Sequence, residues 1–120
     1  MILVVEDAED AREVSTHLAH EQGWRTRSTG SARECLELAA SLLPAAILLD
    51  FGLPDMDGWE VTRRLKAGPA TRSIPIIALT GHVTGEARDR ALRAGVSGYL
   101  VKPCLPQDLV EELRRHVEPA

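Results

Sequence analysis

Aromatic residues and cysteines are both scarce in this sequence. Aromatic side chains make up 3% of the 120 residues, and the two cysteines, Cys35 and Cys104, lie far apart without a CxxC motif or a neighbouring histidine pair. The ligand spacing of a zinc site and the cysteine framework of a disulfide-stabilised domain are therefore both missing. We expect two buried or half-buried free thiols.

Long apolar runs and a basic leader are also missing. No stretch of about eighteen apolar residues could form a transmembrane helix, and Met1 runs directly into aliphatic residues without a small-residue cleavage site. We therefore expect a cytoplasmic protein that does not bind membranes. The net charge of −4 argues against a nucleic-acid surface, and we interpret the basic cluster of Arg63, Arg64 and Lys66 as one solvated helix face.

What the sequence does contain is a fivefold alternation of short apolar runs with longer segments of helical period. This alternation is typical of an α/β domain with a parallel sheet, and the length allows one buried core, so we expect a single domain over residues 1–120. The expected strands are Ile2–Val5, Trp24–Ser28, Ala45–Asp50, Ile74–Thr80 and Ser97–Val101. The expected helices are Glu9–Glu21, Ala32–Leu43, Gly58–Ala67, Gly85–Ala94 and Gln107–Val117. Ser31 can cap the second helix, and Gly23, Gly68 and Gly95 can adopt the left-handed conformation after a helix. The last helix has an apolar stripe of Leu105, Leu109, Leu113 and Val117.

The polarity of the second strand selects the order of the sheet. Strands one, three and four are almost purely aliphatic and suit the centre, whereas Trp24–Ser28 suits an edge. With right-handed crossovers, this predicts a doubly wound five-stranded parallel sheet in the order 2-1-3-4-5 with helices on both faces. Such sheets bind ligands beyond the carboxyl ends of the strands, here between strands one and three.

Three acidic residues follow those two strands. Glu6 and Asp7 come directly after the first strand, and Asp50 ends the third. A polar loop or a helix cap would explain any one of them, as for Asp7, but not the convergence of all three like charges. A hard divalent cation explains it, because Mg²⁺ prefers a few carboxylate oxygens plus water and phosphate oxygens. We therefore expect a Mg²⁺ site.

A hydroxyl and a cation end the remaining strands. Thr80 ends strand four and Lys102 follows strand five, so both should reach the rim that holds the acids. A carboxylate attacks phosphorus poorly until its repulsion from the phosphoryl oxygens is offset, and a metal ion and a lysine supply that offset. This grouping favours phosphoryl transfer with Asp50 as the nucleophile.

Four segments together resemble the receiver domain of two-component response regulators, from Ile2 to about Val117. The resemblance implies the flavodoxin-like form of the doubly wound sheet. The segments are Ile-Leu-Val-Val-Glu-Asp (2–7), Leu-Leu-Asp-Phe-Gly-Leu-Pro-Asp-Met-Asp-Gly (48–58), Ile-Ile-Ala-Leu-Thr-Gly (76–81) and Ala-Gly-Val-Ser-Gly-Tyr-Leu-Val-Lys-Pro (94–103).

The resemblance also implies roles for the residues at the rim. Asp50 would be the phosphoacceptor and Asp7 a direct Mg²⁺ ligand. Glu6 would act on the metal largely through water, and the backbone carbonyl of Gly52 would be a further ligand. Lys102 would contact the phosphoryl oxygens.

A conformational switch is implied as well. Thr80 would turn toward the phosphoryl group, and Tyr99 would fill the space it leaves, which would change the surface formed by the helices at 85–94 and 107–117 and the strand at 97–101. A downstream protein or output domain would bind that surface. The phosphodonor would be a histidine kinase or a histidine phosphotransfer protein.

Some positions depart from the commonest family pattern. Glu6 replaces an aspartate, and its extra methylene favours water-mediated metal contact. His82, two residues after Thr80, leads to the hypothesis that it modulates the lifetime of phospho-Asp50, the alternative being an exposed loop histidine. Pro103 is expected to follow a cis peptide bond, as in the family, which would aim Lys102 into the site.

Two other functions compete with the receiver. One is a Mg²⁺-dependent aspartyl-phosphate phosphatase or phosphotransferase, but Gly52 stands where an acid would protonate the leaving group, so we expect slow self-dephosphorylation without turnover of free substrates. The other is a flavodoxin-like cofactor carrier, whose first loop would need a phosphate cradle instead of acids.

The surroundings of the domain are less determined. The loop sequences after Asp50 and Thr80 resemble receivers attached to hybrid sensor kinases, and a stand-alone regulator is the alternative. Low aromatic content and the absence of an obvious large exposed apolar stripe favour a monomer, with dimerisation through the switch surface as an outcome of phosphorylation.

Overall fold

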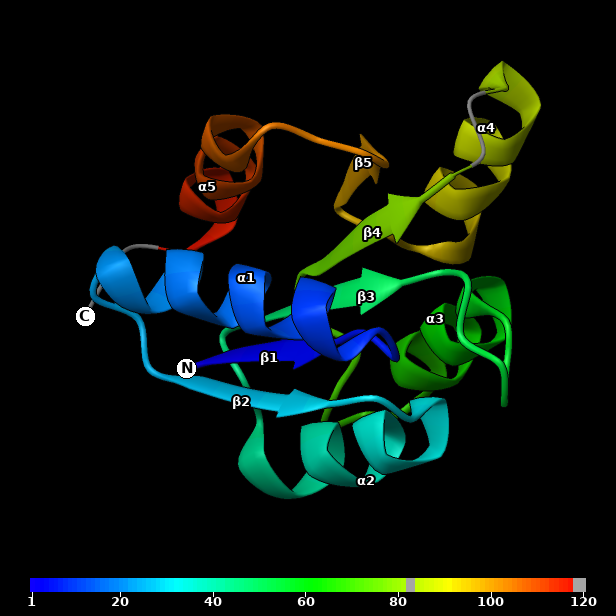
Figure 1. Cartoon of the computed structure of the whole chain (residues 1–120). Coiled ribbons are helices and arrows are strands. Elements are labelled where there is room, and N and C mark those ends of the chain that lie inside the picture. The colour runs from blue at the N-terminus through cyan, green and yellow to red at the C-terminus, as the bar shows by residue number, and fades with distance from the viewer. Residues whose placement is uncertain (82–83, 118–120) are drawn as a thin grey trace.

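The computed structural model describes residues 1–81 and 84–117. Its centre is a parallel sheet whose strands lie in the order β2-β1-β3-β4-β5, so the predicted order is confirmed (Figure 1). The strands are β1 (Ile2–Val5), β2 (Thr26–Thr29), β3 (Ala46–Asp50), β4 (Ile76–Thr80) and β5 (Gly98–Val101). The helices are α1 (Glu9–Glu21), α2 (Ala32–Leu42), α3 (Gly58–Ala67), α4 (Gly85–Ala94) and α5 (Pro106–His116).

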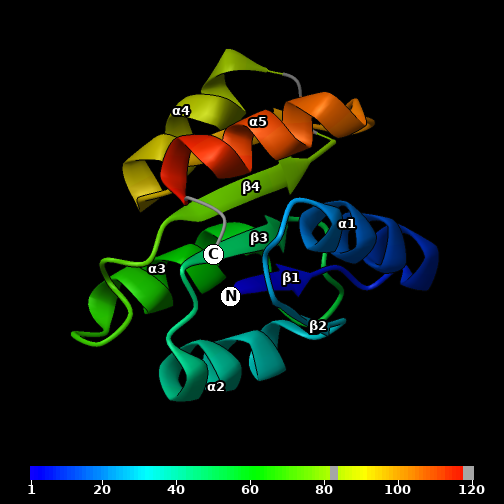
Figure 2. The same cartoon turned by 90° about the vertical axis from the view of Figure 1, so that its left-hand side faces the viewer.

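The helices cover the two faces of the sheet unequally. Helices α1 and α5 pack on one face, and α2, α3 and α4 pack on the other (Figures 1 and 2). Side chains of a strand alternate between these layers, so Leu3 and Val5 enter the three-helix layer while Ile2 and Val4 enter the two-helix layer. Both faces are buried, which is why the central strands are continuous aliphatic runs.

Trp24 differs from its prediction as the start of strand two. The chain turns after α1, where Gly23 has φ 96°, and the Trp24 N–H donates to the Ala19 carbonyl. The indole is only 2% exposed and belongs to the core between the sheet and the helices α1 and α5. The free energy gained by burying this large side chain exceeds what two more strand residues would contribute. β2 therefore begins at Thr26.

Helix ends follow the sequence in most places. Ser31 caps α2 as predicted, accepting a hydrogen bond from the Glu34 N–H at 3.1 Å. Gly68 follows α3 with φ −79°, so the expectation that it adopts the left-handed conformation is wrong. Leu105 precedes α5 and is 57% exposed, although its period placed it in the apolar stripe of that helix.

The basic cluster on α3 is only partly solvated. Arg63 and Arg64 are exposed, but the half-buried Lys66 turns back and its Nζ donates to the carbonyls of Arg72 at 3.0 Å and Ile74 at 2.8 Å. Lys66 therefore holds the segment before β4, and the interpretation of all three as one solvated face is wrong for this residue.

Two sequence-based expectations about the chain as a whole can be compared with the fold. Cys35 is buried and Cys104 is half-buried, and both are free thiols, as predicted. Among the described residues, no helix combines the length and the apolar character needed to cross a membrane.

Candidate functional site

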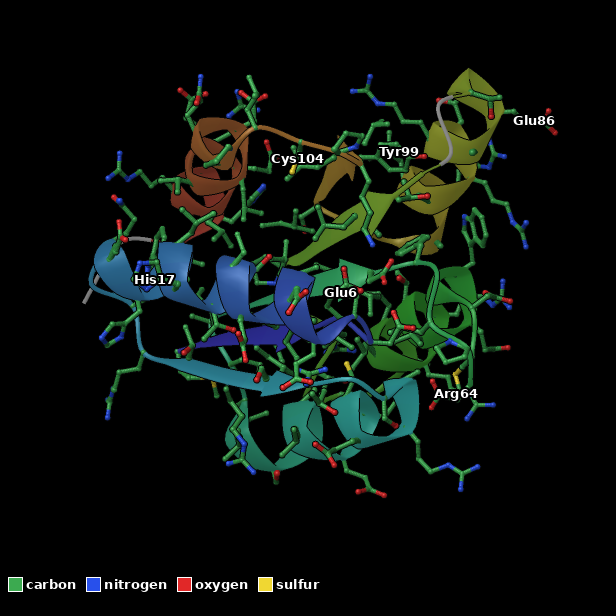
Figure 3. All side chains as sticks on the ribbon, viewed as in Figure 1. Glu6, His17, Arg64, Glu86, Tyr99 and Cys104 are labelled. Carbon is green, nitrogen blue, oxygen red and sulfur yellow. The ribbon has the colours of Figure 1, made fainter. Side chains whose placement is uncertain are left out.

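The three acidic residues converge at the carboxyl ends of neighbouring strands. β1 and β3 are paired in parallel with Val5 opposite Leu49, so the residues that follow lie side by side. One carboxylate oxygen from each of Glu6, Asp7 and Asp50 lies within 4.8 Å of the others. Glu6 and Asp50 are buried and Asp7 is exposed, so the cluster has a closed base and an open rim (Figure 3 labels Glu6).

Lys102 reaches into this cluster from the end of β5. Its Nζ lies 2.9 Å from Asp50 Oδ1 and 3.1 Å from Glu6 Oε1. The Lys102–Pro103 peptide bond is cis, as expected from the family. Burial disfavours the ammonium form, but the hydrogen bonds that Lys102 donates to both carboxylates outweigh burial and hold the pKa of Lys102 above its ordinary value. Lys102 is therefore positively charged at the base of the site.

The two buried carboxyl groups have opposite tendencies to hold a proton. Burial, and then the hydrogen bond with Asp50, raises the pKa of Glu6 to about 7. Burial also acts to raise the pKa of Asp50, but the hydrogen bonds from Glu6, from the Gly52 N–H and from Lys102 lower it below its ordinary value. Asp50 is thus the ionised member of the pair, as a nucleophile requires.

The composition of the cluster fits a hard divalent cation. Glu6 Oε2 is buried with no hydrogen-bond partner among the described residues, which is costly unless a ligand or water meets it. The other donors are carboxylate oxygens and the exposed backbone of Gly52, and Mg²⁺ binds oxygen ligands of this kind. The site therefore offers oxygen ligands and an unpaired buried acceptor in the same place.

A hollow of about 290 Å³ connects these groups with the end of β4. Thr80 is 2% exposed at that strand end and lines the hollow with Gly81. The full lining is Glu6, Asp7, Ala8, Asp50, Phe51, Gly52, Thr80, Gly81 and Lys102. The structure thus brings together every predicted metal-site and acceptor residue.

Tyr99 lies outside that lining, on the neighbouring strand. It is paired with Ala78, two residues before Thr80, so the side chains of Tyr99 and Thr80 project from the same face of the sheet. Tyr99 is half-buried and packs against the layer that contains α4 (Figure 3). His82 lies outside the described residues.

An apolar groove of about 650 Å³ adjoins the acidic hollow and shares Glu6 and Lys102 with it. It runs between α1 and the segment after β5, and Val14 and Leu105 at its sides are each 57% exposed. The sequence-based expectation of a surface without an exposed apolar stripe is wrong here.

Two positions near the site were not singled out from the sequence. Arg12 on α1 donates from Nη1 to the Glu6 carbonyl at 2.9 Å, which holds the end of β1. Asp55, in the loop between β3 and α3, accepts hydrogen bonds from the start of α2. Neither contact can be predicted from the local sequence, because the residues that form it become neighbours only after the chain has folded.

Comparisons with known proteins agree on one family. Residues 2–114 match the response regulator receiver domain. The polar-differentiation response regulator DivK of Brucella ovis is 32% identical over 116 residues, covering 97% of this chain and 94% of that protein.

Solved structures give the same likeness. Chemotaxis response regulator CheY4 of Vibrio cholerae is 27% identical with a TM-score of 0.91, covering 97% of each chain. The receiver domain of sensor histidine kinase PA1611 from Pseudomonas aeruginosa is 33% identical with a TM-score of 0.87, covering 96% of this chain and 94% of that one. That crystal structure has a magnesium ion coordinated in the active site cleft.

Proposed function

The chain belongs to the response regulator receiver domain family, and from that premise we propose that it is a phosphorylatable switch of a two-component or phosphorelay system. Asp50 accepts a phosphoryl group from a phosphohistidine in a Mg²⁺-dependent transfer. The observation that carries the proposal is the contact of Lys102 with Asp50 at 2.9 Å inside the cluster that also contains Glu6 and Asp7.

The chain's own residues account for most of the chemistry. Asp50 Oδ1 is held by the Gly52 N–H at 2.9 Å and by Lys102, which orients the carboxylate. The Asp50 carboxylate attacks phosphorus, the bond between phosphorus and the donor imidazole breaks, and the imidazole leaves with that electron pair. Lys102 and the Thr80 hydroxyl then stabilise the phosphoryl oxygens.

The metal would be held by Asp7 and Asp50 directly, by Glu6 through water and by the Gly52 carbonyl. When bound, Mg²⁺ supplies positive charge that offsets the repulsion between the Asp50 carboxylate and the phosphoryl oxygens. Support for this choice comes from the carboxylate ligands in this chain and from the magnesium ion in the PA1611 receiver.

We assign the chain to signalling, with slow self-dephosphorylation and no turnover of free substrates. Gly52 has no side chain that could protonate a leaving group, which favours this assignment over a phosphatase or phosphotransferase.

The phosphodonor is a histidine kinase or a histidine phosphotransfer protein. Phosphorylation moves Thr80 and Tyr99 and alters the α4-β5-α5 surface for a downstream partner, and their placement on one face of neighbouring strands supports this coupling.

Incubation with a small acyl phosphate tests the proposal. Intact mass spectrometry should find a single phosphoryl adduct with Mg²⁺, none after chelation and none in Asp50→Asn, which keeps the shape of the side chain and loses the nucleophilic carboxylate. An adduct of equal yield in Asp50→Asn, or one that forms equally well without metal, would refute it.

A further inference from the structure

Asp55 connects two parts of the chain that are distant in sequence. It lies in the loop between β3 and α3, and its Oδ1 accepts a hydrogen bond from the Ala32 N–H at 3.0 Å. Its Oδ2 accepts from the Arg33 N–H and from the Ser31 hydroxyl, each at 3.1 Å. The carboxylate is therefore bound at three points to the first turn of α2.

The first turn of a helix has backbone N–H groups without partners inside the helix. In α2 these donors are divided, because Ser31 accepts from Glu34 while Asp55 accepts from Ala32 and Arg33. A negative charge at this end of the helix is favourable. The same hydrogen bonds, first those from Ala32 and Arg33, hold the pKa of Asp55 below its ordinary value.

The loop that Asp55 fixes follows Asp50 and contains Gly52, two of the four predicted metal ligands. Its start is held where the Gly52 N–H donates to Asp50 Oδ1, and its end where Asp57 caps α3 by accepting from the Glu60 N–H at 2.8 Å. Both contacts lie within the loop or its adjoining helix. Asp55 ties the middle of this loop to α2 by hydrogen bonds, beside the buried Leu53, which packs in the same core layer as α2.

We propose that Asp55 is a positioning residue for the metal site, which sets the place of the Gly52 carbonyl and the Asp50 carboxylate by anchoring their loop to α2. This inference rests on the proposed function. A loop that is anchored in advance loses less conformational freedom when it binds an ion, so the anchor contributes to metal affinity.

Calorimetric measurement of Mg²⁺ affinity in variants of Asp55 distinguishes the effect of the anchor from the effect of its charge. We expect Asp55→Ala to weaken Mg²⁺ binding about tenfold, the low end of the usual effect of residues that orient metal ligands. The rate of phosphorylation by acyl phosphate should recover when Mg²⁺ is raised to saturation. Asp55→Asn loses the charge and keeps one of the two oxygen acceptors, so it should restore part of the affinity that Asp55→Ala loses.

Asp57→Ala is the matched control, because it removes a carboxylate and a helix cap from the same loop without breaking the tie to α2. It should bind Mg²⁺ nearly as well as the wild type. Thermal unfolding of every variant checks that each is folded at the assay temperature. If Asp55→Ala is unfolded, Ser31→Ala replaces it, since this variant removes one of the three Asp55 contacts together with the side-chain cap of α2.

Three results would overturn the inference. Equal weakening in Asp57→Ala would show that loss of a nearby carboxylate or of loop order in general, and not the tie to α2, explains the effect. Wild-type affinity in Asp55→Ala would show that the anchor does not act on the metal, while the proposed function would stand. Failure of the wild-type protein itself to bind Mg²⁺ would overturn both.

Discussion

At the scale of single residues, Glu6 shapes the base of the site. Its Oε1 contacts Lys102 at 3.1 Å, while its buried Oε2 has no hydrogen-bond partner among the described residues. Burial of an ionised carboxylate with one oxygen that lacks a hydrogen bond costs free energy, and repulsion from the neighbouring Asp50 adds to that cost. Burial, and then the hydrogen bond with Asp50, therefore raises the pKa of Glu6 to about 7 in the metal-free protein.

Stability of the metal-free protein should depend on the protonation of Glu6. The pKa of Glu6 rises from 4.5 to about 7 on folding. Its contribution is thus fully present below pH 4.5 and is lost as pH rises through about 7. Glu6→Gln cannot ionise, so its free energy of unfolding relative to wild type should rise over this interval by about 1–3 kcal/mol.

Urea unfolding of both proteins with a chelator measures that difference, at about pH 5 and about pH 8. The free-energy gap between Glu6→Gln and wild type should widen at the higher pH. Saturating Mg²⁺ should reverse the trend, because the ionised Glu6 then has a cation nearby. A gap that stays constant with pH would mean that Glu6 is ionised throughout.

The residues of the site differ in how far the sequence could predict them. Asp50, Thr80 and Lys102 each end or follow a parallel strand, so topology alone places them at one edge. Asp55 sits in a loop, and its partners lie 22 to 24 residues earlier, where only the folded geometry brings them close. Side-chain contacts over such separations have no periodic signature in the sequence.

At the scale of elements, the start of α3 is fitted closely to the residue after the acceptor. Phe51 follows Asp50 and lies over Gly58, the first residue of α3. A Cβ atom built at Gly58 would be 2.1 Å from the Phe51 ring. The ring also meets the edge of Trp59 at a centroid distance of 5.3 Å. The acceptor strand and α3 are therefore packed without spare room.

Substitution of two glycines at equivalent helix positions tests this packing. Gly58→Ala should lower the free energy of unfolding by about 1–3 kcal/mol, because the ring or the helix must shift. Gly85→Ala, at the first residue of α4, has no atom of the described residues within 4 Å of the added methyl group. It should be neutral or more stable by about 0.5 kcal/mol. Equal effects in chemical denaturation would contradict the packing account.

Element boundaries were predictable where one physical signal dominates. The aliphatic runs of β1 and β3 are strands within one residue of their predicted bounds, and α2 begins after its serine cap as expected. β4 begins at Ile76, two residues after its predicted start at Ile74, because the Ile74 N–H donates to the Thr71 carbonyl in the turn before the strand. The start of β2 was misplaced because Trp24 has a side chain suited to strands, whereas its burial on the core next to Ala19 determines its place. For a side chain as large as that of Trp24, packing in the core determines the backbone conformation more strongly than the local preference for strand does.

At the scale of the whole molecule, metal binding should stabilise the fold. A ligand that binds only the folded state adds about 2.7 kcal/mol when its concentration is one hundred times its Kd. Thermal unfolding should therefore shift upward with Mg²⁺ and return after chelation. Asp7→Asn should lose this shift while unfolding normally without metal, since Asp7 is exposed. An undiminished shift in that variant would remove Asp7 from the ligand set.

A chain of ring contacts links the site to α4. Trp59 touches Phe51, and the Arg90 guanidinium of α4 lies 4.3 Å from the Trp59 ring centroid. Trp24 lies in the other core layer. Tryptophan emission should therefore change on Mg²⁺ binding or phosphorylation in Trp24→Phe and stay constant in Trp59→Phe. A change in emission in Trp59→Phe and none in Trp24→Phe would show that the structural change reaches the core layer of α1 and α5 instead.

Identification of the phosphorylated atom tests the central claim most directly. Borohydride reduces an aspartyl phosphate to homoserine, which tandem mass spectrometry locates in a digest. After incubation with acyl phosphate and Mg²⁺, homoserine should appear at position 50 and nowhere else. Reduction at Asp7, or a stable adduct that resists borohydride, would contradict the assignment of Asp50 as the phosphoacceptor.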